Sequence, residues 1–291
     1  MKRILITGAT GNVGSEVIRF LMEVNTSNEI TAGVRDVNKA KGQFKNFVNL
    51  KYVCFDFENR DTFEESFTGI DCIFLLRPPQ ISDIDTYFKP LINKIKEKNI
   101  TEIVFLSVQG AEISKIIPHN KIEKLITESG LNHIFLRPSY FMQNLTTTLL
   151  QDIQLKRRII LPAGKAKFNW IDIENIGEIC AILLDRFPDF KNQTIELTGY
   201  ENENFYTVVN LINKTVRNPI SYESVNPIKY YVLKKKSGID KGLIMVMILL
   251  HFLPRFQKLP KISNVYEKLT SKKPTTLTEF IQRESYKFMI D

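Results

Sequence analysis

The sequence predicts an α/β protein with a doubly wound parallel sheet. Short apolar runs alternate with amphipathic helical patterns through the first half of the chain, and a glycine-rich loop directly follows the first apolar run. The chain has 291 residues, of which 43% are hydrophobic and 25% are charged, so a sizeable core can form without metals or crosslinks. This composition excludes a disordered, collagen-like or coiled-coil protein.

The strands of the first half are predicted from short apolar runs bounded by turn residues. They cover Arg3–Thr7, Ile30–Val34, Leu50–Cys54, Cys72–Leu76, Ile103–Ser107 and His133–Arg137. Helices with apolar residues at three- and four-residue spacing lie between them, at Val13–Glu23, Arg60–Phe67, Tyr87–Lys98 and Asn120–Ser129. Because a crossover helix joins consecutive strands, we expect the strands to run parallel.

The loop from Gly8 to Gly14 reads GATGNVG, a GxxGxxG pattern between the first strand and the first helix. Glycines here let the chain turn tightly, bring the backbone close to a pyrophosphate and pack the helix against the strand. The N-terminus of the helix offers free N–H groups and a partial positive charge to phosphate. The order of strand, glycines and helix predicts a dinucleotide-binding domain of the Rossmann type rather than an ordinary turn.

The end of the second strand, Gly33-Val34-Arg35-Asp36, bears on which dinucleotide binds. An NAD-preferring site usually carries an acidic residue at this strand end, which binds the ribose 2′-hydroxyl. Arg35 occupies the tip instead, and a guanidinium pairs with a 2′-phosphate and stacks on adenine. NADP(H) is therefore favoured over NAD(H), although a shift of one residue would put Asp36 in place and restore the NAD pattern.

Residues at the carboxyl ends of the later strands are further cofactor candidates, because ligands of such sheets bind there, near the point where the strand order reverses. They are Asp56 and Phe57 for the adenine, Leu76 and Arg77 for the ribose, and Ser107, Val108 and Gln109 for the nicotinamide. Each is alternatively a loop residue without a ligand contact.

After Tyr140 the alternation loosens. The pattern predicts a helix over 141–151, a strand over 159–161, a helix over 173–185, a strand over 193–197 and a helix over 205–215. We expect residues 1–150 to form the Rossmann domain, with later strands added to its sheet from about 155–200. Residues 200–291 are expected to form a small, mostly helical C-terminal lobe for the substrate.

Several stretches of the chain carry a family resemblance. TGATGNVG near the N-terminus, GVRD after the second strand, SGLNHIFLRPSYFMQNL at 129–145 and NWIDIENIGEICA at 169–181 together resemble the NmrA-like atypical short-chain dehydrogenase/reductases. The similarity is greatest to the branch of triphenylmethane reductase, which also contains NADPH-dependent quinone and azo-dye reductases. The resemblance implies an NADP(H)-binding domain, and the family includes both reductases and proteins that bind the dinucleotide to regulate another process.

The resemblance also assigns residues by position. Those that match the family's dinucleotide-binding residues are Gly8, Thr10, Gly11, Asn12, Val13 and Arg35, to which the glycine loop adds Gly14. The segment Pro138-Ser139-Tyr140-Phe141 matches the loop near the nicotinamide, so Ser139 is a further cofactor candidate. Tyr140, a tentative catalytic residue, and Phe141 and Met142 are candidates for the substrate pocket.

One departure from the wider family concerns proton donation. Classical short-chain dehydrogenases use a Tyr whose pKa is lowered by a Lys four residues on. Here Lys115 stands at the Tyr position and His119 at the Lys position, so alcohol oxidation by that mechanism is not expected. His119 either binds the nicotinamide ribose or supplies a proton, or it only caps its helix.

A reductase needs no tuned side-chain acid when its acceptor is strongly electrophilic, because water can protonate the product. We therefore expect hydride transfer from NADPH to a small quinone- or dye-like acceptor. The apolar segment Gly242–Leu253 is a simple core helix, a substrate lid or a dimer face. The alternative function is a non-catalytic, redox-sensing regulator that binds NADP(H) and acts through a protein partner.

The net charge of +8 is concentrated between Lys229 and Lys273, where Asp240 and Glu267 are the only acidic residues. Such a region is either a solvated face or a site for an anionic substrate or a lipid surface, which Lys234, Lys235 and Lys236 would then contact. No recognition motif accompanies the charge, so nucleic-acid binding is not expected.

The remaining signals concern the compartment. Cys54, Cys72 and Cys180 lie far apart, and we expect them to be buried thiols in a reducing environment. The histidines His119, His133 and His251 lack metal-ligand spacing, so no metal is expected. The N-terminus lacks the apolar stretch of a secretory signal, and no window is long enough to span a membrane. We expect a cytoplasmic protein.

Overall fold

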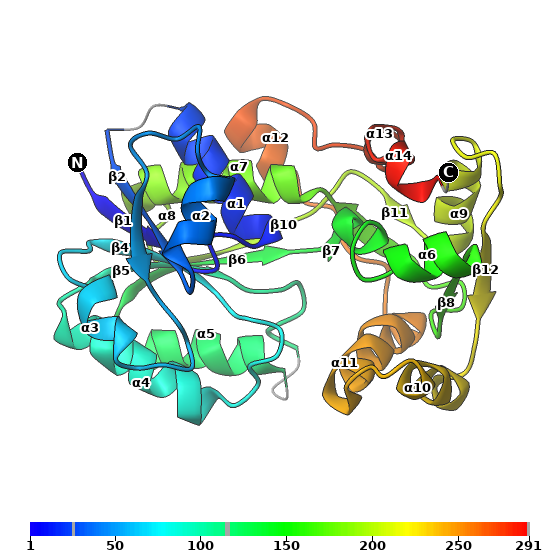
Figure 1. Cartoon of the computed structure of the whole chain (residues 1–291), viewed down its shortest axis with the longest axis horizontal. Helices are drawn as coiled ribbons and strands as arrows, with labels where there is room; N and C mark the ends of the chain where they lie inside the picture. Colours follow the sequence, from blue (N-terminus) through cyan, green and yellow to red (C-terminus); the bar gives the residue numbers. More distant parts are fainter. Residues whose placement is uncertain (25–26, 114–116, 290–291) are drawn as a thin grey trace. The chain divides into compact units, whose positions relative to one another are not determined.

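The computed structural model describes residues 1–24, 27–113 and 117–289, which divide into two compact units. The first unit comprises Met1–Pro138, Ile173–Leu197 and Val265–Ser271, and the second comprises Ser139–Asp172, Thr198–Asn264 and Lys272–Asp291 (Figure 1). Each unit is thus assembled from separate stretches of chain. Residues 139–150, which the sequence placed with the first domain, belong to the second unit.

A seven-stranded sheet forms the centre of the first unit, in the order β10-β6-β5-β4-β1-β2-β3. Its strands are β1 (Arg3–Ile6), β2 (Glu29–Val34), β3 (Lys51–Cys54), β4 (Cys72–Leu76), β5 (Glu102–Leu106), β6 (Asn132–Pro138) and β10 (Gln193–Leu197). Every neighbouring pair is parallel. The predicted fold class is therefore confirmed. The chain builds outward from β1 to β3 and then returns to the other side of β1 with β4, so the strand order reverses between β1 and β4.

Helices cover both faces of this sheet. They are α1 (Asn12–Glu23), α2 (Val37–Gln43), α3 (Thr62–Ser66), α4 (Ile84–Glu97), α5 (Pro118–Glu128), α7 (Ile173–Asp185), α8 (Phe187–Phe190) and α12 (Val265–Thr270). Helices α1 and α7 lie together on one face, and α3, α4 and α5 lie on the other (Figure 1). A Cβ on Gly177 of α7 would stand 2.6 Å from the Cβ of Glu16 in α1, so this glycine permits the close packing of the two helices.

The cysteines are only partly as predicted. Cys72 in β4 and Cys180 in α7 are buried, and burial raises the pKa of both thiols. Cys54 is exposed, which contradicts the prediction. The reason is its place at the end of β3, an edge strand with a neighbour on one side only.

The second unit contains two small sheets. In the first, β9 (Phe168–Ile171) lies between β7 (Tyr140–Phe141) and β11 (Asn202–Glu203). In the second, β8 (Arg158–Leu161) pairs in parallel with β12 (Ser221–Ser224). The strand predicted at 159–161 thus has a partner of its own. Of the later strands, β10 is the one that joins the main sheet.

The helix predicted over 141–151 is replaced by a 3₁₀ turn, η1 (Met142–Leu145), followed by α6 (Leu150–Lys156). Three successive threonines and Leu149 separate the two. The hydroxyls of Thr146 and Thr147 both donate to the carbonyl of Gln143, at 3.2 and 2.8 Å. Such local bonds compete with continuation of a helix, and β-branched residues favour it little.

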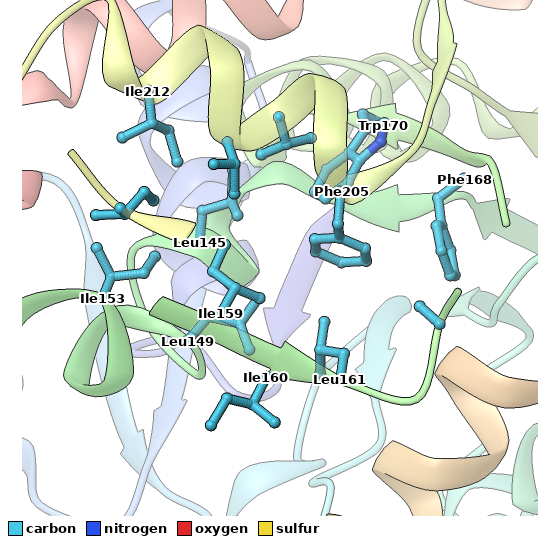
Figure 2. Close-up of a cluster of buried hydrophobic side chains, with 14 of the residues drawn as sticks. Leu145, Leu149, Ile153, Ile159, Ile160, Leu161, Phe168, Trp170, Phe205 and Ile212 are labelled. Atoms are coloured by element: carbon cyan, nitrogen blue, oxygen red, sulfur yellow. The ribbon is translucent and has the colours of Figure 1, made fainter. Parts of the chain in front are cut away.

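Helices and apolar side chains fill the rest of the second unit. Besides α6 and η1, its helices are α9 (Phe205–Asn213), α10 (Pro227–Lys236), α11 (Lys241–Phe252), η2 (Leu253–Phe256), α13 (Leu277–Arg283) and α14 (Ser285–Phe288). Figure 2 shows its core, where Phe205 and Ile212 of α9 meet Leu149, Ile153 and the side chains of β8 and β9. Among the described residues, no helix has the length and apolar character needed to cross a membrane.

Candidate functional site

Open parallel sheets bind their ligands where the strand order reverses, and in this sheet that point lies at the carboxyl ends of β1 and β4. Thr7, buried directly after β1, ties these two ends together. Its hydroxyl donates to the carbonyl of Phe74 at 2.9 Å and accepts from the N–H of Leu76 at 3.0 Å. The glycine loop therefore leaves the sheet from a fixed point.

The glycine loop is shaped by close backbone approach. Gly8 has φ +62°, in the left-handed region that favours glycine. The N–H of Gly11 donates to the carbonyl of Gly8 at 2.9 Å, and a Cβ on Gly14 would stand 2.3 Å from that same carbonyl oxygen. The side chain of Leu76 lies against Gly8, where a Cβ would meet it at 3.2 Å. The loop is thus packed as a dinucleotide-binding turn requires.

The N-terminus of α1 is open. Its N-cap, Gly11, makes no side-chain cap, and the first turn contains no acidic residue. Thr10, Gly11 and Asn12 are exposed, whereas the side chain of Val13 is buried, so Val13 offers only its backbone to a ligand. The uncapped N–H groups and the helix dipole make this turn a ready site for an anion.

Arg35 and Asp36, directly after β2, have different environments. Asp36 is the N-cap of α2, and its carboxylate accepts the N–H of Lys39 at 3.0 Å. Arg35 is exposed, and within the described ranges it has no ion pair. Asp36, the acidic residue that the NAD pattern would need, therefore caps a helix, whereas the guanidinium of Arg35 is available to a ligand.

The loop after β3 is closed by its own side chains. The carboxylate of Asp56 accepts the N–H of Glu58 at 3.0 Å, and the N–H of Asp56 donates to the hydroxyl of Thr62 at 3.1 Å. Phe57 is buried, with its ring centroid 4.9 Å from that of Phe55. The Phe57 ring therefore lies in the core rather than open to an adenine.

Arg77 and His119 meet at the carboxyl end of β4. The guanidinium of Arg77 donates from Nη1 to the carbonyls of Pro78, Pro79 and Ile81, the last at 2.6 Å, and its Nε lies 3.5 Å from Nε2 of His119. Arg77 thus orders its own loop. Burial, aided by the Arg77 charge, lowers the pKa of His119 to about 3, so the imidazole is neutral at physiological pH.

The structure does not place His119 at the cap of its helix. Helix α5 has Ile117 as its N-cap and Pro118 in its first turn, with His119 following inside the helix. The His119 ring stacks on Phe105 of β5, with centroids 6.1 Å apart. Lys115, which stands at the Tyr position of the classical enzymes, lies outside the described residues.

Ser107, after β5, is bound to a buried acid that the sequence analysis missed. Its hydroxyl donates to Oε1 of Glu123 at 2.5 Å, and the same carboxylate accepts two bonds from Arg137, from Nε at 2.9 Å and Nη2 at 2.7 Å. Glu123 in turn raises the pKa of Arg137. The signal that could have revealed Glu123 in the sequence is its position directly after Ile122, on the buried face of α5. Val108 and Gln109 follow half-buried, and the Gln109 N–H donates to the carbonyl of Pro138 at 3.0 Å.

The remaining candidates belong to the second unit. The hydroxyl of Ser139 donates to Oδ1 of Asn169 at 2.6 Å, and Tyr140 bonds to Nε2 of His251 at 2.9 Å. Phe141 is half-buried, whereas Met142 is fully buried in the core of this unit. Burial raises the pKa of Tyr140, so its hydroxyl keeps its proton at neutral pH. The candidates thus form two sets, one in each unit.

Known proteins resemble this chain over nearly its whole length. It is 31% identical over 277 residues to prestalk A differentiation protein A of Dictyostelium discoideum, a match covering 95% of this chain and 90% of that protein. It is 26% identical over 291 residues to an NAD(P)H azoreductase of Xenophilus azovorans, covering 98% and 99%.

Among solved structures, an NADPH-dependent quinone oxidoreductase of Escherichia coli in complex with NADPH aligns with a TM-score of 0.84. The two chains are 21% identical, and the alignment covers 96% of this chain and 99% of that one. The model of the NmrA-like family matches residues 1–281. A parallel sheet that reverses at β1, a glycine loop at that reversal and a match of this extent lead to one conclusion: the chain belongs to the NmrA-like family.

Proposed function

We propose that this protein binds NADP(H) and transfers a hydride to a small, electrophilic quinone- or dye-like acceptor. The observation that carries the proposal is the open N-terminus of α1 behind the glycine loop, with the exposed Arg35 at the end of the neighbouring strand β2. The N–H groups of the turn suit a pyrophosphate, and the guanidinium suits a 2′-phosphate. NADP(H) carries both groups at once.

The residues present fit this cofactor. A Cβ at position 14 would collide with the Gly8 carbonyl, so the space of the turn depends on glycine. Asp36 caps α2 and would leave the 2′ position of a ribose to Arg35. Thr10, Gly11 and Asn12 are exposed and would hold the pyrophosphate. NADP(H) over NAD(H) is therefore our proposal for this chain.

A bound, reduced nicotinamide supplies a hydride. The chain's own residues hold the surrounding frame: the Thr7 hydroxyl joins the ends of β1 and β4, and the Ser107–Glu123–Arg137 bonds join β5, α5 and β6. The Ser107 hydroxyl donates its hydrogen bond to the carboxylate of Glu123, and His119 is neutral at pH 7. Since neither group is a proton donor there, we propose that water protonates the reduced acceptor, which an electrophilic acceptor permits.

The relatives support this class of reaction. Two of the similar proteins are by name an azoreductase and a quinone oxidoreductase, and both names denote reduction of an electrophilic conjugated acceptor. We also propose a cytoplasmic location, because a reducing compartment suits the exposed free thiol of Cys54.

Cofactor binding is tested by calorimetry of NADPH, NADP⁺, NADH and NAD⁺ on the wild type and on Arg35→Glu. We expect NADP(H) to bind more tightly than NAD(H) by about 10- to 100-fold, the worth of a charged hydrogen bond, and the substitution to remove the difference. Lys45→Glu is the matched control, because Lys45 is exposed and the charge change is the same. Equal affinities for all four dinucleotides, or an Arg35→Glu variant that keeps the preference, would reject the assignment.

The reaction is tested by following NADPH oxidation with a panel of quinones, azo dyes and triphenylmethane dyes. Turnover with a member of the panel, lost in a variant that no longer binds NADPH, is the expected result. Tight NADPH binding without turnover across the panel would count against a reductase.

A redox-sensing regulator is the second candidate function. The observation that favours it is that the Ser107 hydroxyl is bonded to Glu123 and the His119 ring to Arg77. Such a protein needs a dinucleotide site but no proton donor. It predicts clearly different affinities for NADPH and NADP⁺ and a protein partner retained in one redox state only. Similar affinities and no partner would remove the reason for it.

A further inference from the structure

Helix α11 is apolar around its whole circumference, yet only one side of it is buried. Ile244, Met247, Ile248 and His251 recur at helical spacing and face the core. The opposite side carries five further apolar side chains that are 42–54% exposed, Leu243, Met245, Val246, Leu249 and Leu250, and Leu253, directly after the helix, is 46% exposed. A surface helix ordinarily carries polar residues on that side, whereas the described part of the chain leaves this apolar face exposed.

The exposed apolar surface extends beyond the helix. Phe256 is 74%, Leu259 is 59% and Ile262 is 53% exposed in the segment that follows α11. Helix α10 packs beside α11 and adds Val232, which is 46% exposed (Figure 1). We call the exposed residues of α11 together with residues 253–262 and the C-terminal half of α10 the apolar-basic surface.

Exposed cations flank these apolar side chains along the chain. Lys235, Lys236, Lys241, Arg255, Lys258 and Lys261 are all exposed, and in the part of the chain that the structure describes none of them forms an ion pair. Asp240 is the one acidic residue in the sequence between 225 and 264, and its carboxylate accepts the N–H groups of Gly242 and Leu243 at the start of α11. The surface is therefore strongly positive at both ends of the helix.

Lys234 does not belong to this surface, although the sequence suggested that it would. Its ammonium group is buried and bonds to the carboxylate of Asp152, itself buried. The cations that face solvent at the end of α10 are Lys235 and Lys236. A test that changes Lys234 would break a buried ion pair rather than report on the surface.

We propose that the apolar-basic surface docks on the anionic face of a lipid bilayer. Exposed Leu, Val, Met and Phe side chains enter the boundary between headgroups and acyl chains, and flanking Lys and Arg side chains meet the acidic headgroups. Two alternatives fit less well. A second copy of the chain would bring two sets of cations together, and a nucleic acid would leave the apolar side chains in water.

The proposal is tested by co-sedimentation of the full chain with vesicles of phosphatidylcholine alone and with added phosphatidylserine. We expect binding to the anionic vesicles that weakens with salt and little binding to the neutral ones. Lys258→Glu/Lys261→Glu should weaken binding by about 30-fold or more, at about fivefold for each charge removed. Leu249→Gln/Leu250→Gln should weaken it by about tenfold or more.

Matched control variants separate an effect of the apolar-basic surface from a general effect of charge or hydropathy. Lys89→Glu/Lys191→Glu makes the same charge change at exposed lysines of the first unit, and Val48→Gln/Leu155→Gln removes apolar side chains that are 92% and 72% exposed. Both controls should bind vesicles as the wild type does.

Four results would overturn the proposal. The first is no binding of the folded chain to anionic vesicles at low salt. The second is an equal loss of vesicle binding in the control variants. The third is a dimer in solution that Leu249→Gln/Leu250→Gln converts to a monomer without affecting vesicle binding, which would make a second copy the occupant. Binding to an oligonucleotide with unchanged affinity in that variant, and none to vesicles, would equally overturn it. NADPH binding is measured on every variant, so that failure of the proposed cofactor site is distinguished from failure of this surface.

Discussion

The hydroxyl of Tyr140 donates a hydrogen bond to Nε2 of His251, 2.9 Å away and 111 positions later in the sequence. The direction follows from the other ring nitrogen: Nδ1 of His251 lies 2.6 Å from the carbonyl of Met247, which only accepts, so Nδ1 carries the proton and Nε2 is the acceptor. Rings of Phe168, Trp170 and Phe205 surround the pair. Tyr140 is therefore a structural link between β7 and α11.

Replacing Tyr140 by Phe should lower the free energy of unfolding by about 1–3 kcal/mol, because the buried acceptor of His251 loses its donor. Urea unfolding measures the change. Turnover should stay within about twofold of wild type, since burial raises the pKa of Tyr140 and its proton is not available near neutral pH. Tyr206→Phe, at a side chain 44% exposed, should change stability by less than about 0.5 kcal/mol. Loss of turnover at unchanged stability would instead make Tyr140 the proton donor.

Stability should fall on acidification because of His251 and His119. Burial lowers the folded-state pKa of His251 to about 4 and that of His119 to about 3, from an ordinary value of 6.5. Below pH 6.5 the unfolded chain takes up protons that the folded chain does not, so the free energy of unfolding decreases as the pH drops toward 4. Each histidine contributes up to about 1.4 kcal/mol per pH unit. In His251→Gln the slope between about pH 6 and 4.5 should be smaller by that amount, and parallel curves for variant and wild type would contradict the assignment.

Gly14→Ala should abolish dinucleotide binding and lower stability by about 1–3 kcal/mol. The new methyl group would stand 2.3 Å from the carbonyl oxygen of Gly8, which is backbone and cannot rotate away. Calorimetry with NADPH and thermal unfolding measure the two effects. Gly42→Ala is the matched control, since a Cβ there meets nothing within 4 Å and the residue lies inside α2. That control should bind NADPH normally and gain about 0.5–1 kcal/mol of stability. Normal NADPH binding by Gly14→Ala would show that the loop is not the pyrophosphate site.

Lys234→Met should destabilise the second unit by about 2–4 kcal/mol. It leaves the buried carboxylate of Asp152 with Lys156 as its remaining cation, 2.7 Å away. Lys235→Met, one position later and exposed, should change stability by less than about 0.5 kcal/mol. The double variant Lys234→Met/Asp152→Leu should recover much of the loss, because no unpaired charge then remains buried. Equal changes in the free energy of unfolding for Lys234→Met and Lys235→Met, measured by chemical denaturation, would argue against the buried ion pair.

Local patterns were sufficient to predict the parallel sheet and the glycine loop. The apolar runs of β1, β2, β4, β5 and β6 have the short length and bounding turns of buried strands, and the amphipathic period of α1 and α4 is visible within each segment. The glycines at 8, 11 and 14 are explained by contacts inside one turn. Each of these features depends on residues close together in the sequence. Helix α2 was missed because it is only seven residues long and depends on the Asp36 cap.

The features that the sequence did not reveal depend on distant partners. Pairing of β8 with β12, the buried Glu123 between Ser107 and Arg137, and the exposed Cys54 each required the neighbours to be known. The basic run around Lys234 gives no sign that this lysine is buried and paired with Asp152, 82 positions earlier in the sequence. The sequence by itself thus determined the parallel sheet and the glycine-rich turn after its first strand, because local propensity and backbone geometry decide them. Only the tertiary structure decided which polar side chains are exposed to a ligand and which are held in the core, because burial and pairing are properties of contacts between segments far apart in the chain.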